Sequence, residues 1–174
     1  NLYDLMGNYG KSEQLHLEAK AIREKLLGKQ HPDYARSLEN LSILYKNMGN
    51  YEKAVWFQLE ALAIKESTEG KEHYQFGLSL HNLAVLYKEM GNYEKAEPLQ
   101  LEAQYIFEKS LGKAHPFYAI CLNNLASIYK DMGNNEKAEP IYLEALSIFT
   151  NSLGTGNPDY VTNLQNLTDV YKEM

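Results

Sequence analysis

The stretch from Leu86 to Glu97, Leu-Tyr-Lys-Glu-Met-Gly-Asn-Tyr-Glu-Lys-Ala-Glu, decides the fold because it recurs almost unchanged at a fixed distance. Met48, Met90 and Met132 lie 42 residues apart, and a Gly-Asn pair follows each of them. A sequence that copies itself with a period between about 20 and 50 residues is typical of stacked repeats, in which each unit buries its apolar face against its neighbours. The period therefore predicts a stacked-repeat protein.

Composition excludes several other classes of protein. The net charge of −6 argues against a nucleic-acid partner, which would need a clustered basic surface. Cys121 is the single cysteine, so the fold needs no internal disulfide and no oxidising compartment. Unbroken apolar runs such as Leu83–Tyr87 are far shorter than the ~20 residues of a membrane-spanning helix. We therefore expect a cytoplasmic protein with no nucleic-acid partner and no membrane partner.

Each repeat is expected to contain two helices. The first, helix A, is predicted from about Pro32 to Met48 and the second, helix B, from about Tyr51 to Thr68, because apolar residues recur at helical spacing in both. We divide residues 1–174 as a single array: a partial first repeat over 1–31, full repeats over 32–73, 74–115 and 116–157, and a final helix A over 158–174. Because both ends fall inside a repeat, we expect the array to be a segment of a longer protein.

Residues that begin and end helices recur with the same period. Gly49 follows helix A, where glycine adopts the left-handed conformation that ends a helix, and Asn50 is placed to cap helix B. His31, His73 and His115 precede or begin successive helices A. All ligands of a shared metal ion must lie ~2 Å from it, so histidines in separate repeats indicate hydrogen-bonded caps or loop residues. We expect no metal and no cofactor.

The pattern within one repeat, Leu38-x-x-Leu41-Ser42-x-x-Tyr45-x-x-x-Gly49-x-Tyr51-x-x-Ala54, resembles the tetratricopeptide helix-turn-helix repeat. That repeat is about 34 residues long, whereas the period of 42 and the motifs Asn-Leu-Ala-x-x-Tyr and Leu-Gly-Lys-x-His-Pro resemble the long variant found in kinesin light chains. The resemblance implies an all-α fold, a right-handed α-α superhelix in which helices A line a concave groove and helices B form the outer surface. It also implies a scaffold for protein–protein interactions.

One face of each helix A is the predicted binding groove for an extended peptide or a partner protein. Residues at i, i+4, i+7 and i+11 share a helix face, and this set lies opposite helix B. Its members are Arg36, Asn40, Ile43 and Asn47 in the first full repeat, Leu78, Asn82, Val85 and Glu89 in the second, Ile120, Asn124, Ser127 and Asp131 in the third, and Asn166 in the final helix.

An asparagine recurs in the middle of helix A, at positions 40, 82, 124 and 166. Asparagine costs ~0.5 kcal/mol or more relative to alanine inside a helix, so another interaction must offset the loss. Each carboxamide could bond the backbone of a bound peptide, since it both donates and accepts. Alternatively it bridges to a neighbouring helix and holds the superhelical pitch. The sequence leaves both interpretations open.

Charges near this face predict the character of the ligand. Arg36 is the one cation on the face, and the lysines Lys46, Lys88, Lys130 and Lys172 lie at its edge. The acidic residues that bias the surface negative are Glu39, Glu89, Asp131, Asp169 and Glu173. We therefore expect a peptide of basic character with apolar anchors.

Outside the face, Trp56 in helix B is expected to be exposed, either as a contact site or as an ordinary surface residue. Departures from the repeat at Glu69 and Tyr74 predict a looser junction over residues 67–76.

Catalytic motifs are not found in this sequence. We find no glycine-rich phosphate loop, His-Glu-x-x-His, Cys-x-x-Cys or serine nucleophile elbow, so we expect no catalytic residues and no enzyme. Two function classes stay open. The first is a module that binds a peptide or protein, and the second is a regulatory arm of a larger multidomain enzyme or nucleotide switch, in contact with domains missing from this segment.

Overall fold

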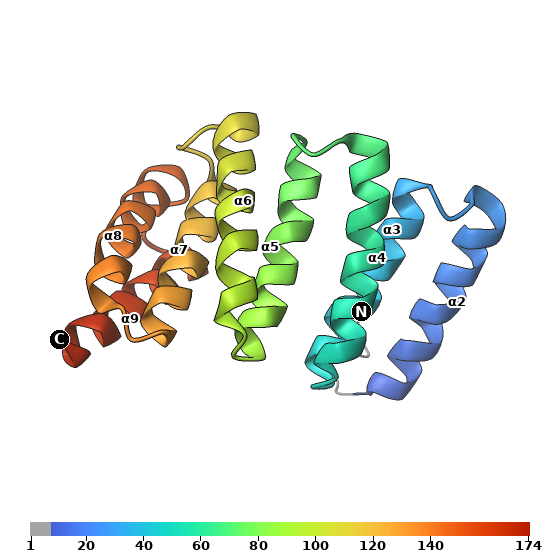
Figure 1. Ribbon diagram of the computed structural model, residues 1–174, viewed down its shortest axis with the longest axis horizontal. Coiled ribbons are helices and arrows are strands. Elements are labelled where there is room, and N and C mark those ends of the chain that lie inside the picture. Colours follow the sequence, from blue (N-terminus) through green and yellow to red (C-terminus); the bar gives the residue numbers. More distant parts are fainter. Residues whose placement is uncertain (1–7) are drawn as a thin grey trace. The chain divides into compact units, whose positions relative to one another are not determined.

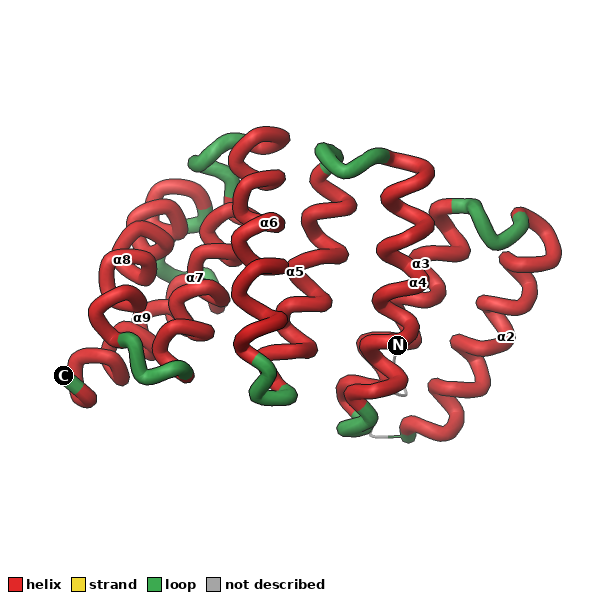
Figure 2. The backbone as a smooth tube through the Cα atoms, in the orientation of Figure 1, coloured by secondary structure: helices red, strands yellow, loops and turns green. Residues whose placement is uncertain are grey.

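A computed structural model describes residues 8–174. Over this range the chain contains eight α-helices and no strand. Figure 2 draws the helices with the loops that join them. This confirms the predicted all-α class of stacked helical hairpins. The helices form two compact units, one ending at Lys71 and the other beginning at Glu72. Residues 1–7, which begin the predicted partial first repeat, lie outside the described residues.

The first unit contains three helices: α2 (Tyr9–Leu27), α3 (Pro32–Asn47) and α4 (Tyr51–Glu69). Helix α3 packs against both α2 and α4, so the three run alongside one another (Figure 1). In repeat terms α3 is a helix A, whereas α2 and α4 are helices B. The predicted bounds of the first full repeat, 32–48 and 51–68, agree with the structure to within one residue.

The second unit contains five helices: α5 (Tyr74–Glu89), α6 (Tyr93–Leu111), α7 (Pro116–Asp131), α8 (Asn135–Ser152) and α9 (Pro158–Glu173). Helix B of each repeat packs between its own helix A and the following one, since α6 contacts α5 and α7, and α8 contacts α7 and α9. The helices A also touch directly, α5 with α7 and α7 with α9. This arrangement brings one face of three successive helices A together.

The turn within each hairpin has the predicted chemistry. Gly49 has a φ of +74°, and the N–H of Asn50 donates to the carbonyl of Tyr45 at 2.8 Å while that of Gly49 donates to Lys46 at 2.9 Å. These two bonds close a helix by the Schellman arrangement. Asn50 Oδ1 then accepts from the N–H of Lys53 at 3.1 Å and caps the next helix. The predictions for Gly49 and Asn50 are confirmed.

The histidines before helices A are helix caps. The Nδ1 atoms of His31, His73 and His115 each accept a backbone N–H two residues further on, at 3.1, 3.3 and 3.1 Å. The hydrogen-bonded interpretation of these residues is confirmed. Between residues 8 and 174, no group of three histidine, cysteine or carboxylate side chains is placed to hold a metal ion.

Hairpins are held together by contacts that recur between helix A and helix B. In the first unit, Tyr45 of α3 stacks on Phe57 of α4 with ring centroids 5.4 Å apart, and Lys53 Nζ lies 4.7 Å from the centre of the Tyr45 ring. Tyr34 Oη donates to Glu60 Oε1 at 3.3 Å. The α7–α8 hairpin repeats the tyrosine–glutamate bond at 3.5 Å and the lysine–tyrosine contact at 5.1 Å.

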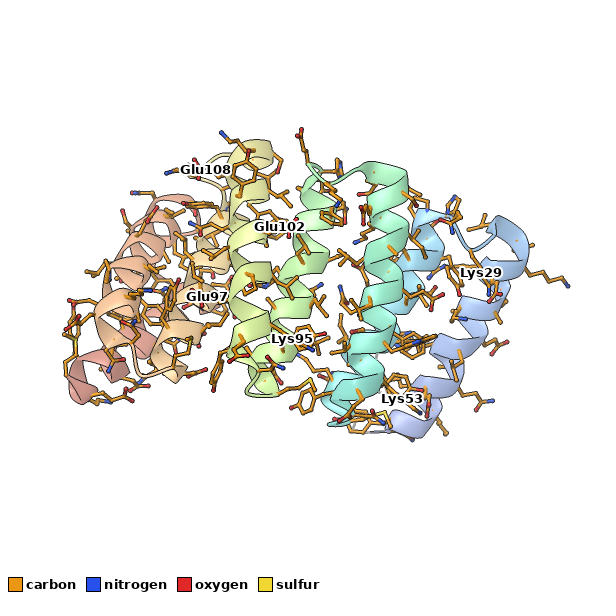
Figure 3. All side chains as sticks on the ribbon, in the orientation of Figure 1. Lys29, Lys53, Lys95, Glu97, Glu102 and Glu108 are labelled. Atoms are coloured by element: carbon orange, nitrogen blue, oxygen red, sulfur yellow. The ribbon has the colours of Figure 1, made fainter. Side chains whose placement is uncertain are left out.

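A second set of contacts joins a helix B to the next helix A. Tyr129 Oη of α7 donates to Glu97 Oε1 of α6 at 2.8 Å, and Figure 3 shows Glu97 on the side of α6 that faces α7. Two causes raise the pKa of Tyr129 to about 12: burial is the larger, and the bond to Glu97 is the smaller. Tyr45 donates in the same way to Glu13 of α2. Val55 holds the corresponding position in α4 and offers no acceptor.

A buried polar cluster lies among α5, α6 and α7. The amide nitrogen of Gln100 donates to the carbonyl of Cys121 at 2.8 Å and lies 3.1 Å from Nδ1 of His81. Because an amide nitrogen only donates, Nδ1 is the acceptor and the neutral ring carries its proton on Nε2. Burial lowers the pKa of His81 to about 4. Cys121 is fully buried, as expected for a small packed residue, and burial raises the pKa of its thiol.

The boundary between the two units falls in the connection that departs most from the repeat. It lies between Lys71 and Glu72, inside the stretch 67–76 for which we expect a looser junction. Helix α5 begins at Tyr74, whereas α3, α7 and α9 each begin at a proline, Pro32, Pro116 and Pro158. The mobility of this junction stays a prediction.

Candidate interaction surface

Most of the predicted groove residues lie in the second unit, on three neighbouring helices. We call this surface the A-face. It comprises Leu78, Asn82, Val85 and Glu89 on α5, Ile120, Asn124 and Asp131 on α7, and Asn166 on α9. Glu89 and Asp131 are exposed and the other members are half-buried. Since α7 contacts both α5 and α9, the three rows are adjacent.

Ser127 differs from the residues predicted with it. Its side chain is only 7% exposed, so the hydroxyl is not available on the accessible side of α7. The corresponding residue of the first full repeat, Ile43, is 51% exposed. The spacing rule placed both on one helix face but could not show how deeply each would be covered. Ser127 is therefore left out of the A-face.

The first unit carries its own row of predicted residues on α3. Arg36, Ile43 and Asn47 are exposed and Asn40 is half-buried. Arg36 Nη1 lies 3.5 Å from Asp33 Oδ1, one turn earlier on the same helix. Both side chains of this pair are largely accessible, so the contact contributes little to stability. The guanidinium of Arg36 stays exposed to a ligand.

The recurring asparagines do not share one role. Asn124 Nδ2 donates to the carbonyl of Ile120 in its own helix at 3.0 Å. Asn166 Nδ2 donates across to Asn123 Oδ1 of α7 at 3.3 Å, which supports the bridging interpretation at that position. Asn40 and Asn82 make no side-chain hydrogen bond within the described part of the chain. These two carboxamides keep their full capacity to donate and accept.

Sequence reasoning missed the partner of Asn166. Asn123 Oδ1 also accepts from Nδ2 of Asn163, a fully buried residue of α9, at 3.1 Å. Three asparagines thus join α7 to α9. A signal was present, because Asn123 and Asn163 hold the positions that His81 and Cys121 hold one repeat earlier. Polar residues recur there because helices from successive repeats meet at these positions.

Most carboxylates near the predicted face have a cation beside them. Lys88 Nζ lies 3.4 Å from Asp131 Oδ2, joining α5 to α7 across the A-face. Lys65 Nζ lies 2.6 Å from Glu39 Oε1, with the two side chains 5% and 15% exposed. Lys172 pairs with Asp169 at 3.0 Å. The negative field expected from the sequence is thus largely neutralised within the chain.

None of the described hollows is lined by an A-face residue. The largest described one has a volume of about 670 Å³ and is lined by the turn residues Met90 to Glu94 together with Met132. None of the predicted groove residues lines it.

Trp56 is 58% exposed, in agreement with the prediction that it lies on the surface of helix B. Its ring meets Phe57 edge-on with centroids 4.7 Å apart. This contact holds one edge of the indole and leaves the rest accessible. Whether Trp56 contacts a partner stays a prediction.

No helix in the described range is long and apolar enough to span a membrane.

The fold and the A-face define a class of protein: an all-α array of helical hairpins whose first helices present an accessible row of side chains. Comparison with known families identifies the array. The tetratricopeptide repeat family model matches residues 1–67, 75–150 and 122–174. The chain belongs to the tetratricopeptide repeat family, in its 42-residue, kinesin-light-chain-like form.

Solved structures give the same result. A crystal structure of BtubC (BKLC) from P. vanneervenii is 30% identical, covers 99% of this chain and 68% of that one, and has a TM-score of 0.86. A kinesin-light-chain-like protein of Podosopora anserina with nearly identical repeats is 25% identical over 98% of this chain and 81% of that one, with a TM-score of 0.80. The Sgt2 tetratricopeptide domain of Aspergillus fumigatus, 19% identical over 80% of each chain with a TM-score of 0.58, shares the fold. No curated protein matches the chain.

Family membership supports a general function. Tetratricopeptide arrays act as scaffolds for protein–protein interactions, and this chain has the fold of such a scaffold over nearly its whole length.

Proposed function

We propose that this chain is a non-enzymatic scaffold that binds an extended peptide, or an extended segment of a partner protein, along the A-face. The carboxamide of Asn82 carries the proposal. It lies half-buried in the middle of α5, where asparagine is unfavourable for the helix. It also makes no hydrogen bond within residues 8–174 that would offset this cost.

The side chains around Asn82 fit a peptide backbone with apolar anchors. Leu78 and Val85 flank it one turn away on either side of α5, and Ile120 lies on the adjacent α7. All three are half-buried, so each still offers apolar surface. A carboxamide between apolar patches can pair with a main-chain amide while the ligand's side chains occupy the patches.

The charges support a modified view of the ligand. The sequence predicts a ligand of basic character, and this preference requires that the carboxylates beside the face have no cation of the chain next to them. Asp131 is paired with Lys88 and Glu39 with Lys65, so we propose recognition through apolar anchors and main-chain bonds, without a strong charge requirement.

The proposal includes a cytoplasmic location, because the one cysteine is buried and the fold uses no disulfide.

The test begins with peptides selected against the 174-residue chain from a random library. Their affinity is then measured for the wild type and for Asn82→Ala. Loss of two hydrogen bonds to a ligand costs at least about 1 kcal/mol, roughly a fivefold increase in Kd. Asn151→Ala is the matched control, because Asn151 is an exposed asparagine on the helix B α8.

An unchanged affinity for Asn82→Ala would contradict the proposal, provided that circular dichroism shows an intact fold. Val85→Glu supplies a second readout, since a carboxylate on an apolar patch should weaken an apolar anchor more than it weakens the fold. An equal loss of peptide affinity for Asn82→Ala and Asn151→Ala would also count against the proposal.

A further inference from the structure

A hollow lies at the turn between α5 and α6, outside the A-face. Its volume is about 670 Å³, which is in the range of sites that hold a small ligand. The five consecutive residues of the turn, Met90 to Glu94, line it together with Met132 at the end of α7. We call it the turn hollow. Because no A-face residue lines it, it is a second candidate site that the proposed function does not use.

Backbone hydrogen bonds hold the turn hollow in shape. The N–H of Gly91 donates to the carbonyl of Lys88 at 2.9 Å, and that of Asn92 donates to Tyr87 at 2.8 Å. Asn92 Oδ1 accepts from the N–H of Lys95 at 3.2 Å. A Cβ added to Gly91 would meet nothing within 4 Å, so the space above the glycine is open. A site that is already formed loses little conformational freedom when a ligand binds.

Two methionines give the turn hollow apolar surface. Met90 and Met132 follow α5 and α7, two helices that contact each other, and are 41% and 47% exposed. A methionine side chain is flexible and polarizable, so it adapts to the shape of an aliphatic chain. The hollow therefore suits a ligand with an unbranched aliphatic stem.

Glu94 gives the turn hollow a negative charge. It is exposed in the first turn of α6, and no cation pairs with it in the part of the chain that the structure describes. The nearest lysines in the sequence are engaged elsewhere. Lys88 Nζ lies 3.4 Å from Asp131 Oδ2, and Lys95, labelled in Figure 3, has its Nζ 5.1 Å from the centre of the Tyr87 ring. The carboxylate of Glu94 is therefore available to a cation of a ligand.

The start of α6 also acts on the charge of a ligand. A helix N-terminus carries a partial positive charge of about half an elementary charge, which attracts anions. Here the full negative charge of Glu94 is larger, and the Asn92 side chain already accepts one of the free N–H groups. An anion is therefore repelled, and a cation is attracted by the difference. The charge and the two methionines together favour a cationic group on an aliphatic stem.

We propose that the turn hollow binds an arginine side chain of a partner protein. The guanidinium group pairs with the carboxylate of Glu94 through two parallel N–H···O bonds, and the aliphatic stem lies against Met90 and Met132. The ring of Tyr93, a half-buried residue that also lines the hollow, offers a face to the planar guanidinium. Lysine fits less well, because an ammonium group has neither the fork of donors nor the plane.

The first test uses N-acetyl-arginine N-methylamide, a blocked arginine that resembles the residue within a protein. It is titrated into the 174-residue chain without any peptide, and the methionine methyl groups, labelled with ¹³C, are followed by NMR. The methyl signals of Met90 and Met132 should shift and saturate with a Kd on the order of 1 mM, while that of Met174 should stay in place. Unshifted signals of Met90 and Met132 would overturn the proposal, whatever the A-face binds.

Three related probes test the chemistry of recognition. The citrulline analogue keeps the shape but has no charge, so it should bind at least about fivefold more weakly. The lysine analogue should also bind more weakly than the arginine probe. Free arginine should bind no more tightly than the blocked form, because its own carboxylate is repelled by Glu94. Equal affinity for citrulline or lysine would overturn the assignment to arginine, and tighter binding of free arginine would contradict a partner protein as the source.

Substitutions in the chain test the residues. Glu94→Gln should weaken binding of the arginine probe at least about fivefold. Its matched control is Glu136→Gln, because Glu136 is exposed at the same repeat position of α8 and lines none of the described hollows. Met132→Lys places a competing cation beside Glu94 at an exposed position and should also weaken binding.

Circular dichroism checks that each variant is folded. An unchanged Kd for both Glu94→Gln and Met132→Lys would overturn the proposal, and so would an equal loss for Glu94→Gln and Glu136→Gln.

Discussion

His81 is expected to link the stability of the second unit to pH. Its side chain is 8% exposed between α5, α6 and α7, and burial lowers its pKa from 6.5 to about 4. A group whose pKa is lower in the folded state binds protons preferentially when the chain unfolds. The stabilisation is therefore complete above pH 6.5 and is lost as the pH falls toward 4.

The size of the effect follows from the shift. One pKa unit corresponds to about 1.36 kcal/mol, so the shift from 6.5 to about 4 corresponds to roughly 3 kcal/mol of unfolding free energy at low pH. This is a large fraction of the stability of a small domain. The loss should be measurable well before the carboxylates are protonated.

The matched variant is His81→Asn, because Asn123 holds the corresponding position one repeat later. Urea unfolding is followed by circular dichroism at several values between about pH 7 and pH 4, and amide exchange over α5 and α6 shows whether this unit is the one affected. The unfolding free energy of the wild type should fall by roughly 3 kcal/mol more than that of the variant over this range. If the unfolding free energies of the wild type and of His81→Asn fell in parallel with pH, burial of a neutral His81 would not be the source of the pH dependence.

Three further changes test the contacts that hold the repeats together. Tyr129→Phe removes the bond to Glu97 and should lower the unfolding free energy by about 1 kcal/mol; Glu97→Gln should cost less after Tyr129→Phe than before it, and additive costs would exclude a coupled pair. Gly91→Ala places a side chain at a φ of +72° and should cost about 1 kcal/mol in thermal unfolding, whereas a more stable variant would contradict the left-handed assignment. Glu39→Ala leaves the 5% exposed Lys65 without its carboxylate and should cost about 3 kcal/mol in urea unfolding, and a loss below about 1 kcal/mol would show that water reaches the lysine.

The regular features of the repeat were predictable from the sequence. A period of 42, a glycine after each helix A and an asparagine before each helix B are local signals, and local signals decide where helices begin and end. The caps at Gly49, Asn50 and His31 were confirmed for this reason. The repeat also fixed which helices pack together, since each helix B needs cover on two sides.

Individual side chains on the predicted groove face of helices A were harder to predict. Ser127 and Ile43 share a repeat position, yet one is 7% exposed and the other 51% exposed. The asparagines at that face differ as well, because Asn166 finds an acceptor on the neighbouring α7 while Asn82 finds none within the described residues. Such differences depend on what stands on the next helix, which helical spacing within one repeat does not contain.

The direct test of peptide binding on the A-face is a map of the ligand's position. A peptide selected against the chain carries a photo-reactive group, and the cross-linked residues are identified by mass spectrometry. The account predicts cross-links on α5, at and beside Leu78, Asn82 and Val85, and on the adjacent helix α7. Cross-links confined to the helices B α6 and α8 would contradict it.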